Sequence, residues 1–344
     1  MEKAAHIIAR SPRDEENETP WRRSLAAAWR DPLALLGALG LDPAAVGFEP
    51  TAAGDFAFRV TREYAARMRA GDPTDPLLLQ VLPHRFERAI VDGFGRDPVG
   101  ESGLEERGSL LQKYAGRALL LLTGACAIHC RYCFRRAYPY AGHVGPTALD
   151  AGLAAIAADA TITEVILSGG DPLVLDDAAL AVLCTRLTAI PHVRRLRIHS
   201  RLPVVLPSRL TDELLEMLGG LPHQPVLVLH ANHARELDDD VRSALGRARA
   251  AGVTLLNQAV LLRGVNDDTD SLAALGERLF DCGVLPYYVH LLDRVAGAAH
   301  FEVDEARARE LEAALRARLP GYLVPRFVRE FAGATSKLPL DILP

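Results

Sequence analysis

Short apolar runs recur about every thirty residues after Arg117, and alanine- and leucine-rich segments with helical spacing separate them. The runs cover residues 118–124, 164–170, 194–200, 225–230, 254–262 and 286–292. Apolar strands that alternate with helices predict an α/β fold, in which a parallel sheet is covered by helices. Right-handed crossovers would curl six such units into a partial (β/α)6 barrel that is open on one side.

The hydrophobic pattern also predicts the organisation of the chain. Residues 1–110 are expected to form a mostly helical N-terminal region, since residues 21–40 and 83–94 show helical spacing. Residues 111–300 should form the barrel, and residues 301–344 a C-terminal helix and a segment that closes the open side. In such folds the reactive groups lie at the carboxyl ends of the strands, which is where the distinctive polar clusters of this chain fall.

Composition narrows the class of protein. The 344 residues carry a net charge of -5, which gives no footprint for nucleic-acid binding. The charged opening residues contain no apolar signal region, and no apolar run approaches the length of a membrane span. We therefore expect a cytoplasmic protein with a small-molecule substrate and no nucleic-acid or membrane partner; its oligomeric state is left open.

Lysine is rare in this chain. Of 39 basic residues only Lys3, Lys113 and Lys337 are lysines, so arginine supplies nearly every positive charge. A lysine retained in such a chain is a candidate for chemistry that requires an amine.

Three of the five cysteines lie in one short segment with the spacing C-x3-C-x2-C: Cys126, Cys130 and Cys133. Three thiolates can hold a four-iron cluster and leave one iron open to a small chelating molecule. The alternative is a structural zinc site that uses His129 or His143 as the fourth ligand. Cys184 and Cys282 lie in predicted helices and are expected to be buried packing residues.

The cysteine motif, with Tyr132 before its last cysteine, resembles the radical S-adenosylmethionine (SAM) superfamily. Together with "LSGGDPL", "SRLPVVLPSRLT", "LHANHARE", "NQAVLLRGVND" and "GATSKLPL" it resembles the lysine 2,3-aminomutase family from about residue 90 onward. The resemblance is closer to short bacterial members that make β-lysine for modification of elongation factor P. It implies a partial TIM-like radical SAM barrel, and an isomerase.

The resemblance implies that Cys126, Cys130 and Cys133 hold a [4Fe-4S] cluster that binds SAM. In "SGGDP" the glycines are expected to leave backbone groups uncovered, so that this turn could meet the methionine end of SAM. The alternative for this turn is a tight connection between a strand and a helix. His230 and Gln258, at or near strand ends, resemble the family's SAM-side and cofactor-side residues; the alternative for His230 is a histidine buried in the core. The candidates for SAM and the cofactor side are Ser168, Gly169, Gly170, Asp171, His230 and Gln258.

Lys337 resembles the family's lysine that forms a Schiff base with pyridoxal 5'-phosphate (PLP), which requires a partly desolvated amine. The alternative is a solvated lysine near the terminus. Candidates for contacts to the PLP phosphate are Lys113 and Arg209, with Arg117 and Arg201 as weaker ones. Lys113 stands where the family shows arginine.

Three charged residues resemble the family's substrate-binding positions. Asp293 and Glu330 match the acids that hold the side-chain ammonium of lysine, and Arg135 matches the group that binds the substrate carboxylate. This arrangement suits L-lysine and opposes glutamate, whose third carboxylate would be repelled. The open alternatives are an aminomutase for arginine or glutamate and a non-enzymatic iron-sulfur protein. The resemblance also implies an electron donor such as flavodoxin or ferredoxin.

Overall fold

The computed structural model describes residues 19–54, 56–102 and 107–342. Within these residues a single sheet contains nine strands, which neighbour one another in chain order. The strands are β1 (Leu110–Tyr114), β2 (Arg117–Leu121), β3 (Glu164–Ser168), β4 (Arg195–Ser200), β5 (Pro225–Leu229), β6 (Thr254–Val260), β7 (Leu285–His290), β8 (Arg326–Arg329) and β9 (Leu338–Pro339).

The sheet is mostly parallel. Strands β2 to β8 pair in parallel, whereas β1 and β9 pair antiparallel to their neighbours at the two edges. The six apolar runs form β2 to β7, and the predicted α/β architecture is confirmed. The seventh parallel strand, β8, was not expected, because its four residues "RFVR" carry too short an apolar pattern.

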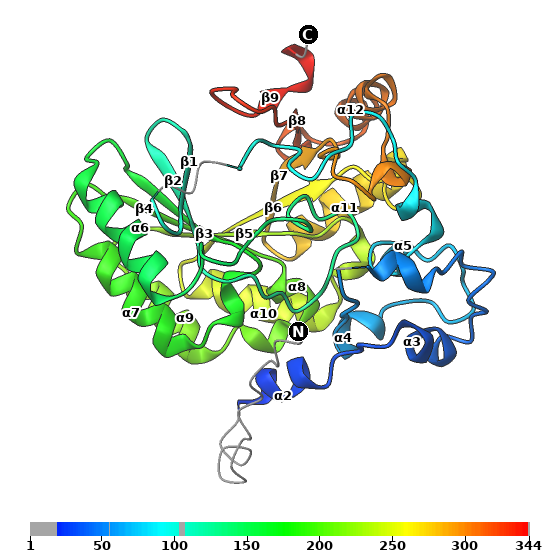
Figure 1. The fold of residues 1–344 in the computed structure, drawn as a ribbon, viewed down its shortest axis with the longest axis horizontal. Coiled ribbons are helices and arrows are strands. Elements are labelled where there is room, and N and C mark those ends of the chain that lie inside the picture. The colour runs from blue at the N-terminus through cyan, green and yellow to red at the C-terminus, as the bar shows by residue number, and fades with distance from the viewer. Residues whose placement is uncertain (1–18, 55, 103–106, 343–344) are drawn as a thin grey trace, which may run out of the picture.

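Helices connect successive strands and pack along the sheet (Figure 1). Most begin at a side chain that caps the first turn; Asp176, Asp238 and Asp268, for example, each accept a hydrogen bond from a backbone N–H three residues later. The connecting helices are α6 (Pro146–Ala158), α7 (Asp177–Thr188), α8 (Leu202–Val205), α9 (Asp212–Gly219), α10 (Asp239–Ala250), α11 (Thr269–Asp281) and α12 (Glu305–Arg318). None of the helices in the described ranges is both long and apolar enough to cross a bilayer.

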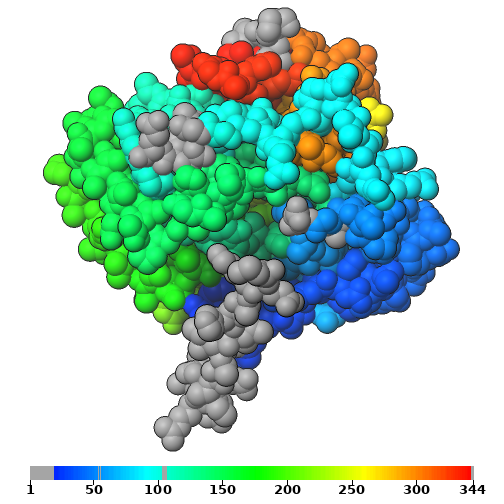
Figure 2. Space-filling model, viewed as in Figure 1, coloured from blue at the N-terminus to red at the C-terminus, as the bar shows by residue number. Residues whose placement is uncertain are grey.

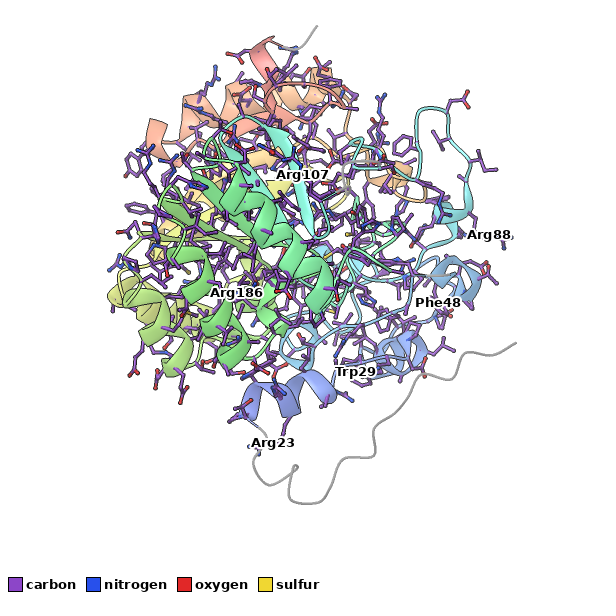
Figure 3. All side chains as sticks on the ribbon, turned by 60° about the vertical axis from the view of Figure 1, so that its left-hand side comes forward. Arg23, Trp29, Phe48, Arg88, Arg107 and Arg186 are labelled. Carbon is purple, nitrogen blue, oxygen red and sulfur yellow. The ribbon has the colours of Figure 1, made fainter. Side chains whose placement is uncertain are left out.

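The N-terminal region is less helical than expected. Its described helices are α2 (Pro20–Ala26), α3 (Pro32–Ala38), α4 (Arg62–Ala65) and α5 (Pro76–Leu79), and turns and short 3-10 segments connect them. Prolines at 20, 32 and 76 start helices. Isolated bridges join Trp29 to Val60 and Phe48 to His84, and Figure 3 places both aromatic residues in this segment.

The C-terminal segment folds back on the sheet. Val328 pairs with Pro339 and Arg329 with Leu338, so that β8 and β9 form an antiparallel ribbon. Figure 2 shows this end of the chain, in red, packed along the top of the molecule. Because the ribbon turns back on itself, the side chains of Glu330 and Lys337, which are seven residues apart, contact each other.

Candidate active site

The carboxyl ends of the parallel strands surround a cavity of about 310 Å³. The ends are in register, since Leu121 is opposite Ser168, and His290 is opposite both Val260 and Val328. Residues that follow these strands therefore meet at one edge of the sheet. Every site residue expected from the sequence lines this cavity except Arg209.

The three cysteines lie in the loop after β2 and face the cavity as free thiols. Burial raises the pKa of Cys126 well above its usual value, and the nearby Asp171 and the other two thiols add to the effect. The pKa of Cys133 is raised to about 11 by burial and by Cys130. Burial thus favours the neutral thiol at Cys126 and Cys133, and a bound cation would stabilise their thiolate forms.

The donor set fits a cluster better than a single metal ion. Within the described residues, no group of three histidine, cysteine, aspartate or glutamate side chains is placed to share one ion. His129 Nδ1 donates to the backbone oxygen of Ala57, outside the cavity lining. A four-iron cluster binds each thiolate to a different iron and so spaces them more widely. Neither His129 nor His143 lines the cavity with the three cysteines, so the zinc alternative lacks its expected fourth ligand there.

Cys184 and Cys282 are away from the cavity, as predicted. Cys184 lies in α7 and is 1% exposed, and Cys282 follows α11 and is 3% exposed.

The "SGGDP" turn after β3 supports the cysteine loop with two of its backbone N–H groups. The N–H groups of Gly170 and Asp171 donate to the backbone oxygens of Thr123 and Ala125, at 2.6 and 2.8 Å. The Asp171 carboxylate accepts from Ser200 Oγ and from the backbone N–H groups of Arg201, Leu202 and Leu173. Two of the backbone groups that were expected to be uncovered are therefore occupied, because the turn uses them to join β3 to the cysteine loop.

The two glycines are required by this close approach. Gly169 has a φ of 125°, a region that side chains rarely adopt. A Cβ at Gly170 would lie 2.3 Å from the backbone oxygen of Ala125. The glycines therefore allow the β3 turn to pack directly against the loop that carries the cysteines.

We expect Gly170→Ala to destabilise the protein by about 1 to 3 kcal/mol, because the added methyl group displaces the cysteine loop. Thermal unfolding and iron content of the reconstituted protein measure the effect. Gly246→Ala in α10 is the matched control, since a Cβ there meets nothing within 4 Å and should stabilise the helix by about 0.5 to 1 kcal/mol. Equal melting temperatures for the two variants would contradict the packing argument.

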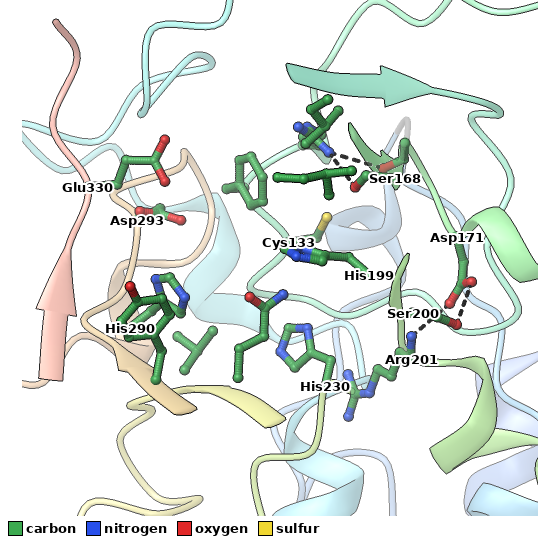
Figure 4. Close-up of a pocket in the computed structure, with 18 of the residues that line it drawn as sticks. Cys133, Ser168, Asp171, His199, Ser200, Arg201, His230, His290, Asp293 and Glu330 are labelled. Carbon is green, nitrogen blue, oxygen red and sulfur yellow. Dashed lines mark hydrogen bonds between the residues drawn. The ribbon is translucent and has the colours of Figure 1, made fainter. Parts of the chain in front are cut away.

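At the other end of the cavity, Glu330 lies between two lysines. Lys113 Nζ donates to its Oε1 at 2.7 Å, and Lys337 Nζ donates to its Oε2. Burial alone would raise the pKa of Glu330, but the two ammonium groups lower it to about 2. Asp293 lies beside Glu330 (Figure 4), and burial raises its pKa to about 7, although Lys337 opposes the shift.

Arg135 is held by an acid that the sequence did not reveal. Its Nε and Nη2 both donate to Glu101 at 2.8 Å, and its Nη1 donates to Ser168 Oγ at 3.2 Å. Glu101 is 5% exposed and lines the same cavity. No strand, motif or spacing marks Glu101 in the sequence, so only the fold identifies it.

The four candidates for phosphate binding separate into three positions. Lys113 and Arg117 line the Lys337 end of the cavity, and Arg117 Nε is buried without a hydrogen-bond partner. Arg201 lies at the cysteine end, beside Cys130. Arg209 lies outside the cavity, where it binds Asp177 and the backbone oxygens of Leu173 and Leu175. The structure therefore assigns Arg209 to packing between loops, which corrects its expected role.

Imidazoles line the middle of the cavity (Figure 4). Burial lowers the pKa of His230 to about 3, and burial places the pKa values of His199 and His290 well below the usual range. The Nε2 atoms of His199 and His230 are buried without a hydrogen-bond partner. Gln258, from β6, lines the same wall. His199 and His290 were missed, although each is a polar residue at the carboxyl end of a predicted strand.

Comparison with known proteins identifies the family. Residues 120–275 match the model of the radical SAM superfamily. The chain is 47% identical to L-lysine 2,3-aminomutase of Escherichia coli, with 98% of each chain covered. The chain belongs to the radical SAM lysine 2,3-aminomutase family.

Other members are also similar. The L-lysine 2,3-aminomutase of Haemophilus influenzae is 43% identical, with 96% of this chain and 98% of that protein covered. Among solved structures, a radical SAM methyltransferase from Sphaerobacter thermophilus covers 68% of this chain and 70% of its own at 19% identity, with a TM-score of 0.45. That likeness is too weak to support a conclusion. Family membership therefore rests on sequence.

Proposed function

We propose that this chain is an L-lysine 2,3-aminomutase, an isomerase that moves the α-amino group of L-lysine to the β-carbon. The observation that carries the proposal is that one cavity contains both the three cysteines of the radical SAM motif and Lys337. An electron-transfer or cluster-delivery protein would need the cysteines alone. Membership in the lysine 2,3-aminomutase family supports the same activity.

The donor groups of the cavity support three cofactors. Cys126, Cys130 and Cys133 would hold a [4Fe-4S] cluster, and Ser168, His230 and Gln258 lie where they could contact SAM. Lys337 would carry PLP, with Lys113 and Arg117 as the cations for its phosphate. When bound, the cluster and SAM supply a carbon radical that removes hydrogen from the substrate, and PLP delocalises the resulting radical. The sheet would then curl into a partial radical SAM barrel, with β8 as a seventh parallel strand beyond the six predicted, and its mouth would have to exclude water during the reaction.

The charges in the cavity suit a substrate with a distal cation. Glu330 already accepts hydrogen bonds from two lysine ammonium groups, so the ammonium of a substrate lysine offers the same chemistry in competition with them. Asp293 is a second carboxylate beside it. Arg135 Nη1, next to Ser168, is the group proposed to take the substrate carboxylate.

Two physiological proposals follow from the family rather than from the cavity. The reducing electron would come from a one-electron donor such as flavodoxin or ferredoxin. The product, β-lysine, would be used for modification of elongation factor P.

Anaerobic turnover tests the proposed activity. The reconstituted protein with SAM, PLP and a chemical reductant should convert L-lysine to β-lysine, and arginine and glutamate should react poorly. Product from arginine or glutamate but not from lysine would assign a different aminomutase. Absence of PLP from protein that contains the cluster would support the non-enzymatic alternative.

We expect Asp293→Asn to lower kcat/KM for lysine about ten- to a hundredfold, because a hydrogen bond to a charged group contributes about 1.5 to 3 kcal/mol. The carboxylate form of Asp293 predominates above its pKa of about 7. The kcat/KM of the wild type should therefore rise with pH through about 7, since this parameter reports the free enzyme, and the variant should lack this step.

Asp281→Asn at the exposed end of α11 is the control for Asp293→Asn. It should leave both kcat/KM for lysine and its rise with pH through about 7 unchanged. Unchanged lysine use in Asp293→Asn would remove Asp293 from the substrate site.

A further inference from the structure

A buried arginine contacts one of the cysteines. Arg201 follows β4, is 6% exposed, and its Nη1 donates to Cys130 Sγ at 2.6 Å. Figure 4 shows Arg201 next to Ser200, on the side of the cavity away from Asp293 and Glu330. Arg201 therefore lies at the cysteine end of the cavity and not at the end where Lys337 contacts Glu330.

The other contacts of the guanidinium hold it in this orientation. Nη1 also donates to the Tyr132 hydroxyl at 2.6 Å. Nη2 donates to Gln80 Oε1 at 2.8 Å, to Glu236 Oε2 at 2.9 Å and to the Tyr64 hydroxyl at 3.2 Å. A guanidinium with this many buried acceptors cannot rotate toward solvent without leaving them unsatisfied.

The acceptors are themselves fixed. Gln80 Nε2 donates to Glu236 Oε1 at 3.1 Å, and Asn232 Nδ2 donates to both Gln80 Oε1 and the Tyr132 hydroxyl. Gln80, Asn232 and Glu236 are fully buried. The backbone oxygen of Gln80 accepts from the N–H of Arg131, within the cysteine loop. The network therefore positions the guanidinium and the loop together.

Two members of this network come from outside the region matched by the superfamily model. Tyr64 is in α4 and Gln80 directly follows α5, whereas the match covers residues 120–275. The N-terminal segment, for which the sequence suggested no chemistry, therefore contributes two contacts to the guanidinium.

We propose that Arg201 is a positioning residue that donates a hydrogen bond to the cluster-ligating sulfur of Cys130, and that Tyr64 and Gln80 hold it there. A one-electron reduction adds a negative charge to the cluster. A neighbouring cation that donates to a ligand sulfur stabilises the reduced form more than the oxidised form, and raises the reduction potential. The inference rests on the proposed cluster but not on the identity of the substrate.

Redox titration with dithionite, monitored by electron paramagnetic resonance of the reduced cluster, tests the proposal without any turnover. We expect Arg201→Gln to lower the ratio of reduced to oxidised cluster about tenfold at a fixed potential, equivalent to a midpoint about 59 mV more negative for a one-electron couple. Arg201→Lys retains the charge and should shift the midpoint less. An unchanged midpoint in Arg201→Gln protein that contains the cluster would overturn the proposal.

Tyr64→Phe serves where Arg201→Gln does not fold, because it removes a single buried hydroxyl group that holds the guanidinium. Its midpoint should shift in the same direction by a smaller amount, and an unshifted midpoint would overturn the role of the network. Arg67→Gln is the matched control. Arg67 binds the backbone oxygens of Val204 and Glu236 close to the network, but contacts no sulfur. It should lower the melting temperature without changing the midpoint, whereas an equal shift in this variant would reduce Arg201 to a general structural role.

Failure of the Arg201 proposal can be distinguished from failure of the proposed function. Wild-type protein that binds no iron would remove both proposals. Wild-type protein that holds a cluster but does not convert lysine would contradict only the proposed activity, and the titration would still decide the role of Arg201.

Discussion

Replacement of Lys337 by arginine is expected to abolish covalent attachment of PLP and to reduce aminomutase turnover by orders of magnitude. Arginine keeps the positive charge next to Glu330, but its guanidinium stays protonated and cannot supply the free amine that attachment requires. The iron-sulfur spectrum and SAM binding should be retained, because the cysteines lie at the other end of the cavity. Borohydride reduction followed by mass spectrometry of the PLP-bearing peptide measures the attachment.

Lys113→Arg is the matched control for Lys337→Arg. Both lysines donate to the carboxylate of Glu330. Each variant therefore replaces an ammonium group beside Glu330 with a guanidinium. Lys113→Arg should keep the PLP adduct on Lys337. An adduct found on Lys113 in the Lys337→Arg protein would show that Lys113 is the anchor.

Loss of one cluster ligand should reduce aminomutase turnover about as strongly as Lys337→Arg. Cys130→Ala removes one of three thiolates and the sulfur that Arg201 contacts, so iron content and reductive cleavage of SAM should both fall to background. Iron analysis and detection of 5'-deoxyadenosine measure these quantities.

Cys184→Ala should leave iron content and SAM cleavage near the wild-type values. Its thiol is buried in α7 and is not among the residues that line the cavity. Iron that persists in Cys130→Ala and is lost in Cys184→Ala would reverse the ligand assignment.

The strands were predictable because their signal is local. Each of β2 to β7 is a short apolar run, and the helices between them have residues such as Asp176 and Asp238 at their first turns. The rule that parallel strands present their carboxyl ends at one edge then grouped the cysteines, His230 and Asp293 correctly around one cavity. A strand as short as β8 gives no comparable signal.

The details of the cavity could not be predicted, because they depend on partners distant in sequence. Glu101 binds Arg135 across 34 residues, and Lys113 binds Glu330 across 217. The turn after β3 was expected to have free backbone groups, but Thr123 and Ala125 occupy two of them. Arg209 was expected at a phosphate, although a salt bridge with Asp177 holds it elsewhere. Such pairings are set by packing, which a linear pattern does not encode.

The sequence by itself determined the α/β class and the family. It also identified the three cysteines as candidate ligands and, through the rarity of lysine, Lys337 as a candidate for amine chemistry. Each of these inferences depends on a local pattern or on composition. The tertiary structure decided which charges meet. It placed Glu330 between two lysines, Arg135 against Glu101, and Arg201 against Cys130. The physical reason is that electrostatic and hydrogen-bonding interactions act over a few ångströms in space, and the distances between side chains exist only once the chain has folded.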